Sequence, residues 1–476
     1  MNALPSNPAA DEIPTFAIVG HPNKGKSSLV ATLAHDSDVQ ISAQSGTTEF
    51  NQTFPMSVDG EVLYQLTDTP GFQRARQVWD WLQKNSSSVA DRAQTVRNFV
   101  EQHRDNTLFT AECELLRPLT EGAGILYVVD GSVPYGNEYD AEMEILRWTG
   151  QPSMALINQI HDSDFHEEWE SALSQYFRIV RRFNAQLADF DRQLGLLSGF
   201  SELNENWRDR LLTAVNLLRR RREGQRTASA MVIAELIHQA MTCQIDTELP
   251  DQENDSDSVA KTLRQELQNS IVQMESNARQ DIERLYHFDR LDAEEDTLSL
   301  DHNQLFSATS WEMFGLAKDQ LLVAGAVGGA ATGGIVDIAT GGGSLMLGTG
   351  IGAIVGGVSA FLSEQKMFQS TLRKTGLGND RLTVGPIESV NFPYVLLGRA
   401  LNHVSVIEGR THARQDVLRI QGEESRKWQQ LSSMVKPLGA LFADIKKQKL
   451  SRAESGRQLS TLILEILKNE RSGSGE

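Results

Sequence analysis

The residues best suited to chemistry lie in the stretch GHPNKGKSSL, which runs from Gly20 to Leu29. Its first eight residues fit the pattern G-x-x-x-x-G-K-S, a glycine-rich turn whose backbone N–H groups surround phosphate oxygens at a helix N-terminus. In this pattern Lys26 reaches the β- and γ-phosphates of a nucleotide, and the hydroxyl of Ser27 binds Mg²⁺. The apolar run FAIV precedes the turn and the helical stretch SSLVATLAH follows it. The sequence therefore predicts a phosphate site between a strand and a helix.

The segment SGTTEF, residues 45–50, offers a threonine hydroxyl for Mg²⁺ and the terminal phosphate. Thr48 is the first choice for this role, and Thr47 is the alternative. Because such a hydroxyl is needed only when the γ-phosphate is present, we expect this segment to change conformation with the state of the nucleotide.

The segment YQLTDTPGF, residues 64–72, is an apolar strand that ends in polar residues. We expect the carboxylate of Asp68 to hold Mg²⁺ through water and Gly71 to offer its N–H to the γ-phosphate. The predicted metal-binding residues are therefore Ser27, Thr48 and Asp68.

Further apolar runs predict an α/β domain with a doubly wound sheet. The expected strands are FAIV (16–19), the strand ending at Asp68, GILYVVDGS (124–132), SMALINQIHD (153–162) and FRIVRRFNA (177–185). Strands that alternate with helices in this way place a ligand at the carboxyl ends of the strands. We assign residues 1–187 to this phosphate-binding domain and residues 188–476 to a mostly α-helical C-terminal domain.

The segments GHPNKGKSSL, SGTTEF, DTPGF and NQIHD resemble the G1 to G4 motifs of the TrmE–Era-like GTPases, over roughly residues 16–185. This resemblance implies a G domain that binds GTP and GDP with Mg²⁺ and hydrolyses GTP to GDP and phosphate. A G domain ahead of a long C-terminal domain with a glycine-rich core also resembles an uncharacterised bacterial GTPase family. The residues assigned to the nucleotide phosphates are Asn23, Lys24, Gly25, Lys26, Ser27, Ser28, Asp68 and Gly71.

The resemblance also implies a K⁺ ion at Asn23, where it would offset charge that develops between the β- and γ-phosphates. The alternative is that Asn23 only shapes a turn. Phe72 stands where Ras-like GTPases carry a glutamine that positions water, and a phenylalanine cannot do this. We therefore expect slow intrinsic hydrolysis that depends on K⁺, on a G-domain dimer or on a protein effector. The predicted catalytic residues are Asn23, Lys26, Thr48 and Gly71.

The motif that recognises the base departs from the expected N-K-x-D. The chain has Asn158 followed by Gln159 in place of lysine, and Asp162 comes one residue late. A small bulge could bring Asp162 to guanine, or the site has lost stringency and tolerates ATP. Asn184 and Ala185 stand where the S-A-K motif is expected.

Composition limits the partners and the compartment. The chain of 476 residues has a formal net charge of -18, which disfavours a uniformly basic surface for nucleic acid and leaves only a local patch open. Cys113 and Cys243 fit no disulfide or zinc pattern, and the N-terminal sequence has no secretory signal. We expect a cytoplasmic protein, with the periphery of the inner membrane as the alternative.

After residue 187 the pattern is helical, and no strand is expected. Apolar residues at steps of three and four predict a long helix over residues 258–288, as bundle core, stalk or dimer seam. LSTLILEILKNE (459–470) predicts a second helix with one apolar face. Arg219–Arg222 are expected at a helix C-terminus, either solvated or in contact with anionic lipid or RNA.

The glycine-rich segment 321–362 contains a single charged residue, Asp337. Glycines at steps of four predict two helices folded back on each other as a hairpin. Three interpretations remain open: a dry hairpin packed inside the C-terminal domain, a hairpin that enters a membrane, and a flexible linker.

The expected function is a GTPase switch coupled to a helical effector domain. The alternatives are a dynamin-like membrane-associating GTPase, an RNA- or tRNA-linked GTPase of TrmE–Era type, and a binding module that does not hydrolyse GTP.

Overall fold

The computed structural model describes residues 13–33, 50–58, 61–161, 163–184, 190–249, 256–286, 368–373, 380–409 and 424–469, together with 305, 306, 310, 311 and 314. The chain forms two compact units. The first comprises Met1–Arg221 with Gly409–Gln415, and the second comprises Arg222–Glu408 with Asp416–Glu476.

The first unit is built on a six-stranded sheet with the order β2-β3-β1-β4-β5-β6. β2 pairs antiparallel with β3, and the remaining pairs are parallel. The strands are β1 (Thr15–Val19), β2 (Gln52–Val58), β3 (Glu61–Asp68), β4 (Gly124–Asp130), β5 (Ser153–Asn158) and β6 (Ile179–Phe183). The five expected strands are confirmed, and β2 is an additional edge strand.

Both faces of this sheet are covered, as β1 shows. Phe16 and Ile18 point into one apolar cluster, and Ala17 and Val19 point into another on the opposite face. The first cluster is closed by α1 (Lys26–Leu33), α7 (Phe190–Ser201) and the first half of α8 (Glu205–Thr242). The second is closed by the helices that lie between β3 and β6 in the chain. A sheet with helices on both faces is the expected doubly wound α/β fold.

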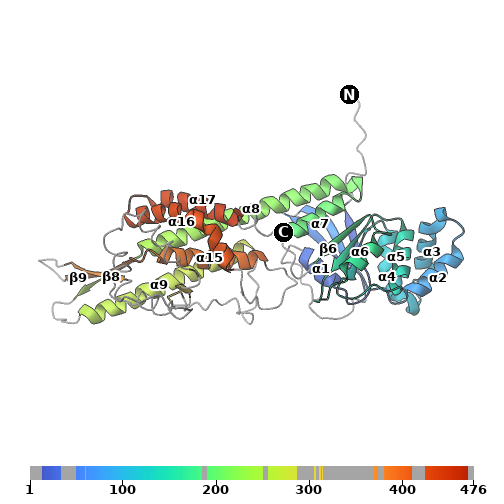
Figure 1. Cartoon of the computed structure of the whole chain (residues 1–476), viewed down its shortest axis with the longest axis horizontal. Helices are drawn as coiled ribbons and strands as arrows, with labels where there is room; N and C mark the ends of the chain where they lie inside the picture. Colours follow the sequence, from blue (N-terminus) through green and yellow to red (C-terminus); the bar gives the residue numbers. More distant parts are fainter. Residues whose placement is uncertain are drawn as a thin grey trace, which may run out of the picture. The chain divides into compact units, whose positions relative to one another are not determined.

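Three helices rather than one connect β3 to β4. They are α2 (Ala75–Asn85), α3 (Arg92–Gln102) and α4 (Thr110–Thr120), with short 3-10 turns at Val89–Asp91 and Thr107–Phe109. In Figure 1, α2 and α3 lie beside α4 and α5 (Glu138–Thr149), on the side away from the sheet. α6 (His166–Leu173) completes this face. α4 therefore lies between the sheet and the outer helices.

The first unit extends beyond the boundary expected after residue 187. Phe200 of α7 stacks on Phe16 with 4.2 Å between ring centroids, and Trp207 of α8 meets the same ring edge-on at 5.1 Å. The compact units divide at Arg221 and Arg222, because the side chains that follow β6 complete the core of the sheet.

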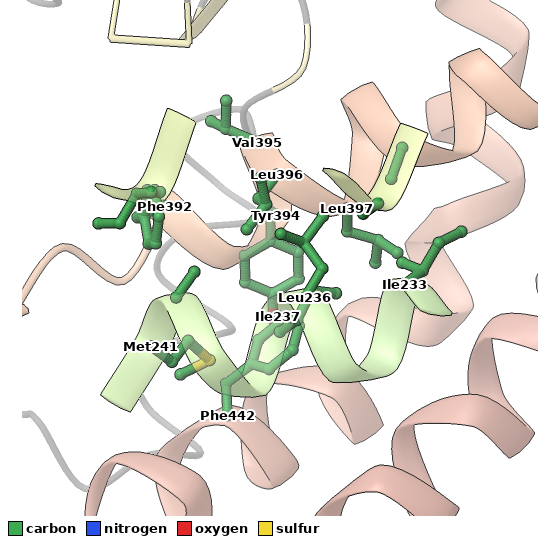
Figure 2. Close-up of a cluster of buried hydrophobic side chains, with 14 of the residues drawn as sticks. Ile233, Leu236, Ile237, Met241, Phe392, Tyr394, Val395, Leu396, Leu397 and Phe442 are labelled. Atoms are coloured by element: carbon green, nitrogen blue, oxygen red, sulfur yellow. The ribbon is translucent and has the colours of Figure 1, made fainter. Parts of the chain in front are cut away.

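The second unit is mostly helical. Its helices are the second half of α8, α9 (Ser256–Leu285), α15 (Phe392–Gly409), α16 (Glu424–Lys446) and α17 (Arg452–Asn469). Figure 2 shows Tyr394 of α15 among Leu236, Ile237 and Met241 of α8 and Phe442 of α16. The Tyr394 hydroxyl donates to the carbonyl of Val435 at 2.9 Å, so its one polar group is satisfied. The apolar stripes expected on α9 and α17 are buried in this core, which makes them bundle core.

Two expectations for the residues after 187 are wrong. β7 (Ile245–Leu249), β8 (Phe368–Arg373) and β9 (Asp380–Ile387) form a three-stranded sheet of order β7-β9-β8, where no strand was expected. Its strands are short, and the alternation in β9 is interrupted by glycine and proline, which are typical of turns. Arg219–Arg222 lie in the interior of α8 rather than at a helix end.

The glycine-rich segment 321–362 lies outside the described residues. Within the part of the chain that the structure does describe, no helix combines the length and apolar character needed to cross a bilayer.

Candidate functional site

The phosphate loop between β1 and α1 depends on glycine at two positions. Gly20 has φ of +144°, and a Cβ there would lie 2.3 Å from the carbonyl oxygen of Val128. Gly25 has φ of +82°, and a Cβ would lie 2.4 Å from Nδ2 of Asn158. Side chains at these positions would therefore push the loop away from the strand ends. Asn23 is exposed and has φ of +60°, a conformation that asparagine adopts more readily than most residues.

Lys26 begins α1 and is buried within the loop. Its Nζ donates to the carbonyl oxygens of His21 at 3.0 Å and Gly20 at 3.4 Å. Burial lowers the pKa of this amine, while the nearby carboxylates of Asp68 and Glu142 act in the opposite direction. A buried ammonium whose hydrogen bonds among the described residues go to two neutral carbonyls is well suited to pair with a phosphate anion.

Ser27 and Asp68 come together as the sequence predicted. The Ser27 hydroxyl donates to Oδ2 of Asp68 at 2.6 Å, which joins the start of α1 to the end of β3. Two hard oxygen ligands beside a phosphate site fit Mg²⁺, which is usually held by one or two carboxylates together with phosphate oxygens. Among the described residues, no group of three or more His, Cys, Asp or Glu could hold a metal by itself. Thr47 and Thr48 lie outside the described residues.

The loop after β3 is docked on the phosphate loop. A Cβ on Gly71 would lie 2.4 Å from the backbone nitrogen of Pro22, so the two backbones are in close contact. The Phe72 N–H donates to the Gly20 carbonyl at 3.2 Å, and the Thr69 hydroxyl donates to the Ile18 carbonyl at 2.7 Å. The Phe72 side chain is buried in the core of the first unit. The Phe72 ring therefore cannot contact a water molecule beside a bound phosphate.

The ends of β4 and β5 bring polar groups to the other side of the loop. Asp130 and Asn158 are neighbours in the sheet, and Asn158 Nδ2 donates to the Lys24 carbonyl at 3.2 Å. The Lys24 ammonium lies 3.4 Å from Oδ2 of Asp130. Asp130 was not anticipated as a site residue, although its place at the end of an apolar strand is the signal that could have found it.

The base-recognition segment is only partly described. Gln159 Nε2 donates to the carbonyl of His161 and, at 2.7 Å, to that of Ser163, so this side chain ties its own loop together. The backbone N–H of Gln159 donates to Phe183, and Asn184 follows it at the end of β6. Asp162 and Ala185 lie outside the described residues.

Ser28, which was assigned to the nucleotide phosphates, follows Ser27 in the first turn of α1.

A buried carboxylate on α5 was missed by the sequence reasoning. Glu142 Oε1 lies 2.9 Å from Nδ1 of His21 in the phosphate loop, and Oε2 accepts a hydrogen bond from the Tyr127 hydroxyl at 2.9 Å. Burial raises the pKa of Glu142, and its hydrogen bonds with His21 and Tyr127 and the charge of Lys26 oppose this. Glu142 lies on the same face of α5 as the buried Tyr139 and Leu146, and this spacing in the sequence could have indicated that it is buried.

Comparison with known families assigns the greater part of the chain. Residues 170–469 match the family described as "Domain of unknown function (DUF3482)". The chain belongs to the DUF3482 family. Residues 15–159 of this DUF3482 protein match a second family, described as "50S ribosome-binding GTPase". With the sheet order and the phosphate loop, this match identifies the first unit as a G domain of the P-loop GTPase type.

Individual relatives share short stretches with this DUF3482 protein. It is 35% identical over 77 residues to GTPase Der of Lactobacillus acidophilus, which is 16% of this chain and 18% of that protein. It is 36% identical over 81 residues to GTPase Der of Nitrosomonas europaea, 17% of each chain. The chain thus covers less than a fifth of the length of these relatives. A crystal structure of Aquifex aeolicus Era bound to GDP·AlF4⁻ matches at 15% identity with a TM-score of 0.28, over 58% of this chain and 89% of that one.

Proposed function

We propose that this protein binds GTP and hydrolyses it to GDP and phosphate as a molecular switch. The observation that carries the proposal is the phosphate loop, where Lys26 is buried and the Ser27 hydroxyl lies 2.6 Å from the Asp68 carboxylate. The similarity of residues 15–159 to a GTPase family supports the same chemistry. Lys26 would hold the β- and γ-phosphates, and the docked Gly71 would present its N–H to the terminal phosphate.

The proposal includes two cations. Ser27 and Asp68, with Thr48, would hold Mg²⁺, which neutralises charge on the β- and γ-phosphates when bound. Asn23 would be a ligand of K⁺, and its exposure leaves the amide available for this role. The left-handed backbone at Asn23 equally suits a turn residue, so a K⁺ dependence of turnover decides between the two roles.

Guanine is the base we propose, with Asn158, Gln159, Asp162, Asn184 and Ala185 forming the base pocket. Asn158 already fastens the phosphate loop through the Lys24 carbonyl. Because Gln159 replaces the lysine of the usual motif, we expect this pocket to discriminate against adenine less strongly than a pocket with the complete motif.

The helical second unit is proposed as the effector domain of a cytoplasmic switch. Its activator would be a second G domain or a protein effector, because the buried Phe72 supplies no water-positioning group. Association of residues 321–362 with the inner membrane would make the protein a membrane-linked GTPase instead.

Equilibrium binding of fluorescent GDP and ADP, with Mg²⁺, tests the site. Lys26→Ala is expected to weaken GDP binding by at least about tenfold, because it removes a charge-assisted contact to phosphate. Lys84→Ala, at an exposed lysine in the last turn of α2, is the matched control and should bind GDP like the wild type. Unchanged GDP binding by Lys26→Ala contradicts the site, and equal binding of ADP contradicts guanine selectivity.

A further inference from the structure

The loop that follows β3 is held by a carboxylate from a different helix. Glu112 belongs to the first turn of α4, and its side chain is only 1% exposed. Its Oε1 accepts hydrogen bonds from the backbone N–H of Gln73 at 2.9 Å and of Arg74 at 2.5 Å. These two residues directly follow Gly71 and Phe72, the part of the loop that is docked on the phosphate loop.

Glu112 places a carboxylate beside the N-terminus of α2, which has no side-chain cap, and it accepts from the N-cap residue Arg74 and from the preceding Gln73. Arg74 is the N-cap residue of α2, and its own side chain makes no capping hydrogen bond. The N-terminus of a helix carries unsatisfied N–H groups and a partial positive charge, so a carboxylate there is favourable. Among the described residues, no cation lies within ion-pair distance of Glu112. The backbone N–H groups of Gln73 and Arg74 are therefore the partners of Oε1, whereas the buried Oε2 has no hydrogen-bond partner among the described residues.

The same helix also contacts the residue that follows the segment 45–50, in which the Mg²⁺ threonine is proposed. Nδ2 of Asn51 donates to the backbone carbonyl of Glu114 at 2.7 Å. Asn51 directly follows residues 45–50, which hold the proposed Mg²⁺ threonine. α4 thus makes polar contacts with the residues next to both segments, one through a side chain and one through its backbone.

We propose that Glu112 is a positioning residue that holds Gly71 beside the phosphate loop, ready for the terminal phosphate. This inference rests on the proposed function, because it assumes that Gly71 contacts the γ-phosphate. Glu112 does not touch the nucleotide and acts through the backbone of Gln73 and Arg74. With Glu112 in place, the loop does not have to be ordered when GTP binds, and that ordering cost would otherwise weaken GTP binding.

The contribution of Glu112 should be specific to the triphosphate. GDP has no terminal phosphate for Gly71 to contact, so its affinity should not depend on Glu112. The ratio of the dissociation constants for GMPPNP, a GTP analogue that is not hydrolysed, and GDP therefore reports the positioning role. A purely structural role would move both affinities together.

Glu114 provides a matched control on the same helix. Its side chain is also largely buried, but its carboxylate pairs with Arg117 at 2.6 Å instead of with the loop. Replacing the side chain of Glu114 leaves its backbone carbonyl in place for Asn51. The variants Glu112→Ala and Glu114→Ala thus both remove a buried carboxylate from α4, and only one of them releases the loop.

The experiment is to measure GDP and GMPPNP affinities, thermal unfolding and GTP turnover for the full chain and its variants. Glu112→Ala should raise the ratio of the GMPPNP and GDP dissociation constants about tenfold and slow hydrolysis by a similar factor. Its GDP affinity should stay within about twofold of the wild type. Glu112→Gln keeps one acceptor oxygen without charge, so it should raise the ratio by about threefold. Glu114→Ala should leave the ratio unchanged.

A ratio that does not change in Glu112→Ala, that falls, or that changes equally in Glu114→Ala overturns the positioning role. If Glu112→Ala does not fold, Glu112→Gln decides in the same way, and a wild-type ratio in that variant overturns the role. Wild-type protein that binds neither nucleotide overturns the proposed function as well. Wild-type protein that binds and hydrolyses GTP, with an unchanged ratio in Glu112→Ala, overturns only the positioning role.

Discussion

Gly20 shows what one position in the phosphate loop requires. Its φ of +144° is rarely adopted by residues with a side chain, and a Cβ there would meet the Val128 carbonyl at 2.3 Å. Because that carbonyl is backbone in the central strand β4, it cannot move aside as a flexible side chain would. Both the conformation and the close approach therefore call for glycine.

Comparing Gly20→Ala with Gly150→Ala separates the cost of a positive φ from the cost of the Cβ clash. Gly150 ends α5 with φ of +72°, and a Cβ there would meet nothing within 4 Å. Gly150→Ala should cost about 1 kcal/mol for its conformation, and Gly20→Ala about 2 kcal/mol more because of the clash. Urea unfolding of the full chain measures both. Equal losses of unfolding free energy in the two variants would show that the loop relaxes without cost.

At the residue scale, sequence reasoning found the groups that a local motif fixes. Lys26 and Ser27 lie in one uninterrupted pattern, and Asp68 ends a recognisable strand that pairs with β1. Glu112 and Glu142 were missed, because each reaches its loop from a helix distant in sequence. The sequence of a helical segment such as TAECELLRPLT does not indicate which backbone N–H groups the side chain of Glu112 will contact.

At the scale of elements, α8 is the element that sequence reasoning handled least well. It was expected to end at the arginine run 219–222, but it continues to Thr242. A basic run followed by EGQ is typical of a helix end, and only packing shows otherwise. Residues before the run complete the sheet core, whereas residues after it belong to the helical core. The small sheet of β7, β8 and β9 was missed because its strands are short and distant in sequence.

An ion cluster joins α8 to α15 in the second unit, beside the apolar core that the two helices share. Glu408 of α15 accepts from Nε of Arg226 at 2.7 Å and from the Tyr286 hydroxyl at 2.9 Å, and Arg222 lies 3.6 Å away. Burial alone would raise the pKa of Glu408, but the contacts with Arg226, Arg222 and Tyr286 outweigh it and hold that pKa below its usual value.

Glu408→Gln should therefore destabilise the second unit in a pH-dependent way. A carboxylate whose folded pKa is lowered stabilises the fold above its ordinary pKa of about 4.3, and this stabilisation is lost as the pH falls through the lowered folded value. At pH 7 the variant should lose about 3 kcal/mol, because the buried Arg226 loses the charge of the Glu408 carboxylate. The difference from the wild type should shrink below about pH 4, as urea unfolding at several pH values would measure.

Asp444→Asn is the control for this prediction. Asp444 pairs with Lys449 at 3.2 Å in the same unit, but both side chains are well exposed. Its loss should cost less than about 1 kcal/mol at any pH. A Glu408→Gln variant that loses the same free energy at pH 4 and at pH 7 would contradict the role given to the ion cluster.

At the scale of the whole molecule, the chain combines a G domain with a helical unit of the DUF3482 family. The fold class was predictable because strands that alternate with helices, followed by long helices, leave few architectures open. The boundary was less predictable, because α7 and the first half of α8 look like the start of the helical unit in sequence and pack with the sheet in space.

Hydrolysis of GTP is the central claim, and single-turnover kinetics test it most directly. GTP and ATP would each be mixed with excess full-length protein in K⁺ and in Na⁺, at several protein concentrations, with Lys26→Ala as the control. The account predicts that GTP is cleaved to GDP and phosphate faster in K⁺ than in Na⁺, that ATP is cleaved more slowly, and that Lys26→Ala loses the activity. Tight binding of GTP without cleavage in either salt, or undiminished cleavage by Lys26→Ala, would contradict it.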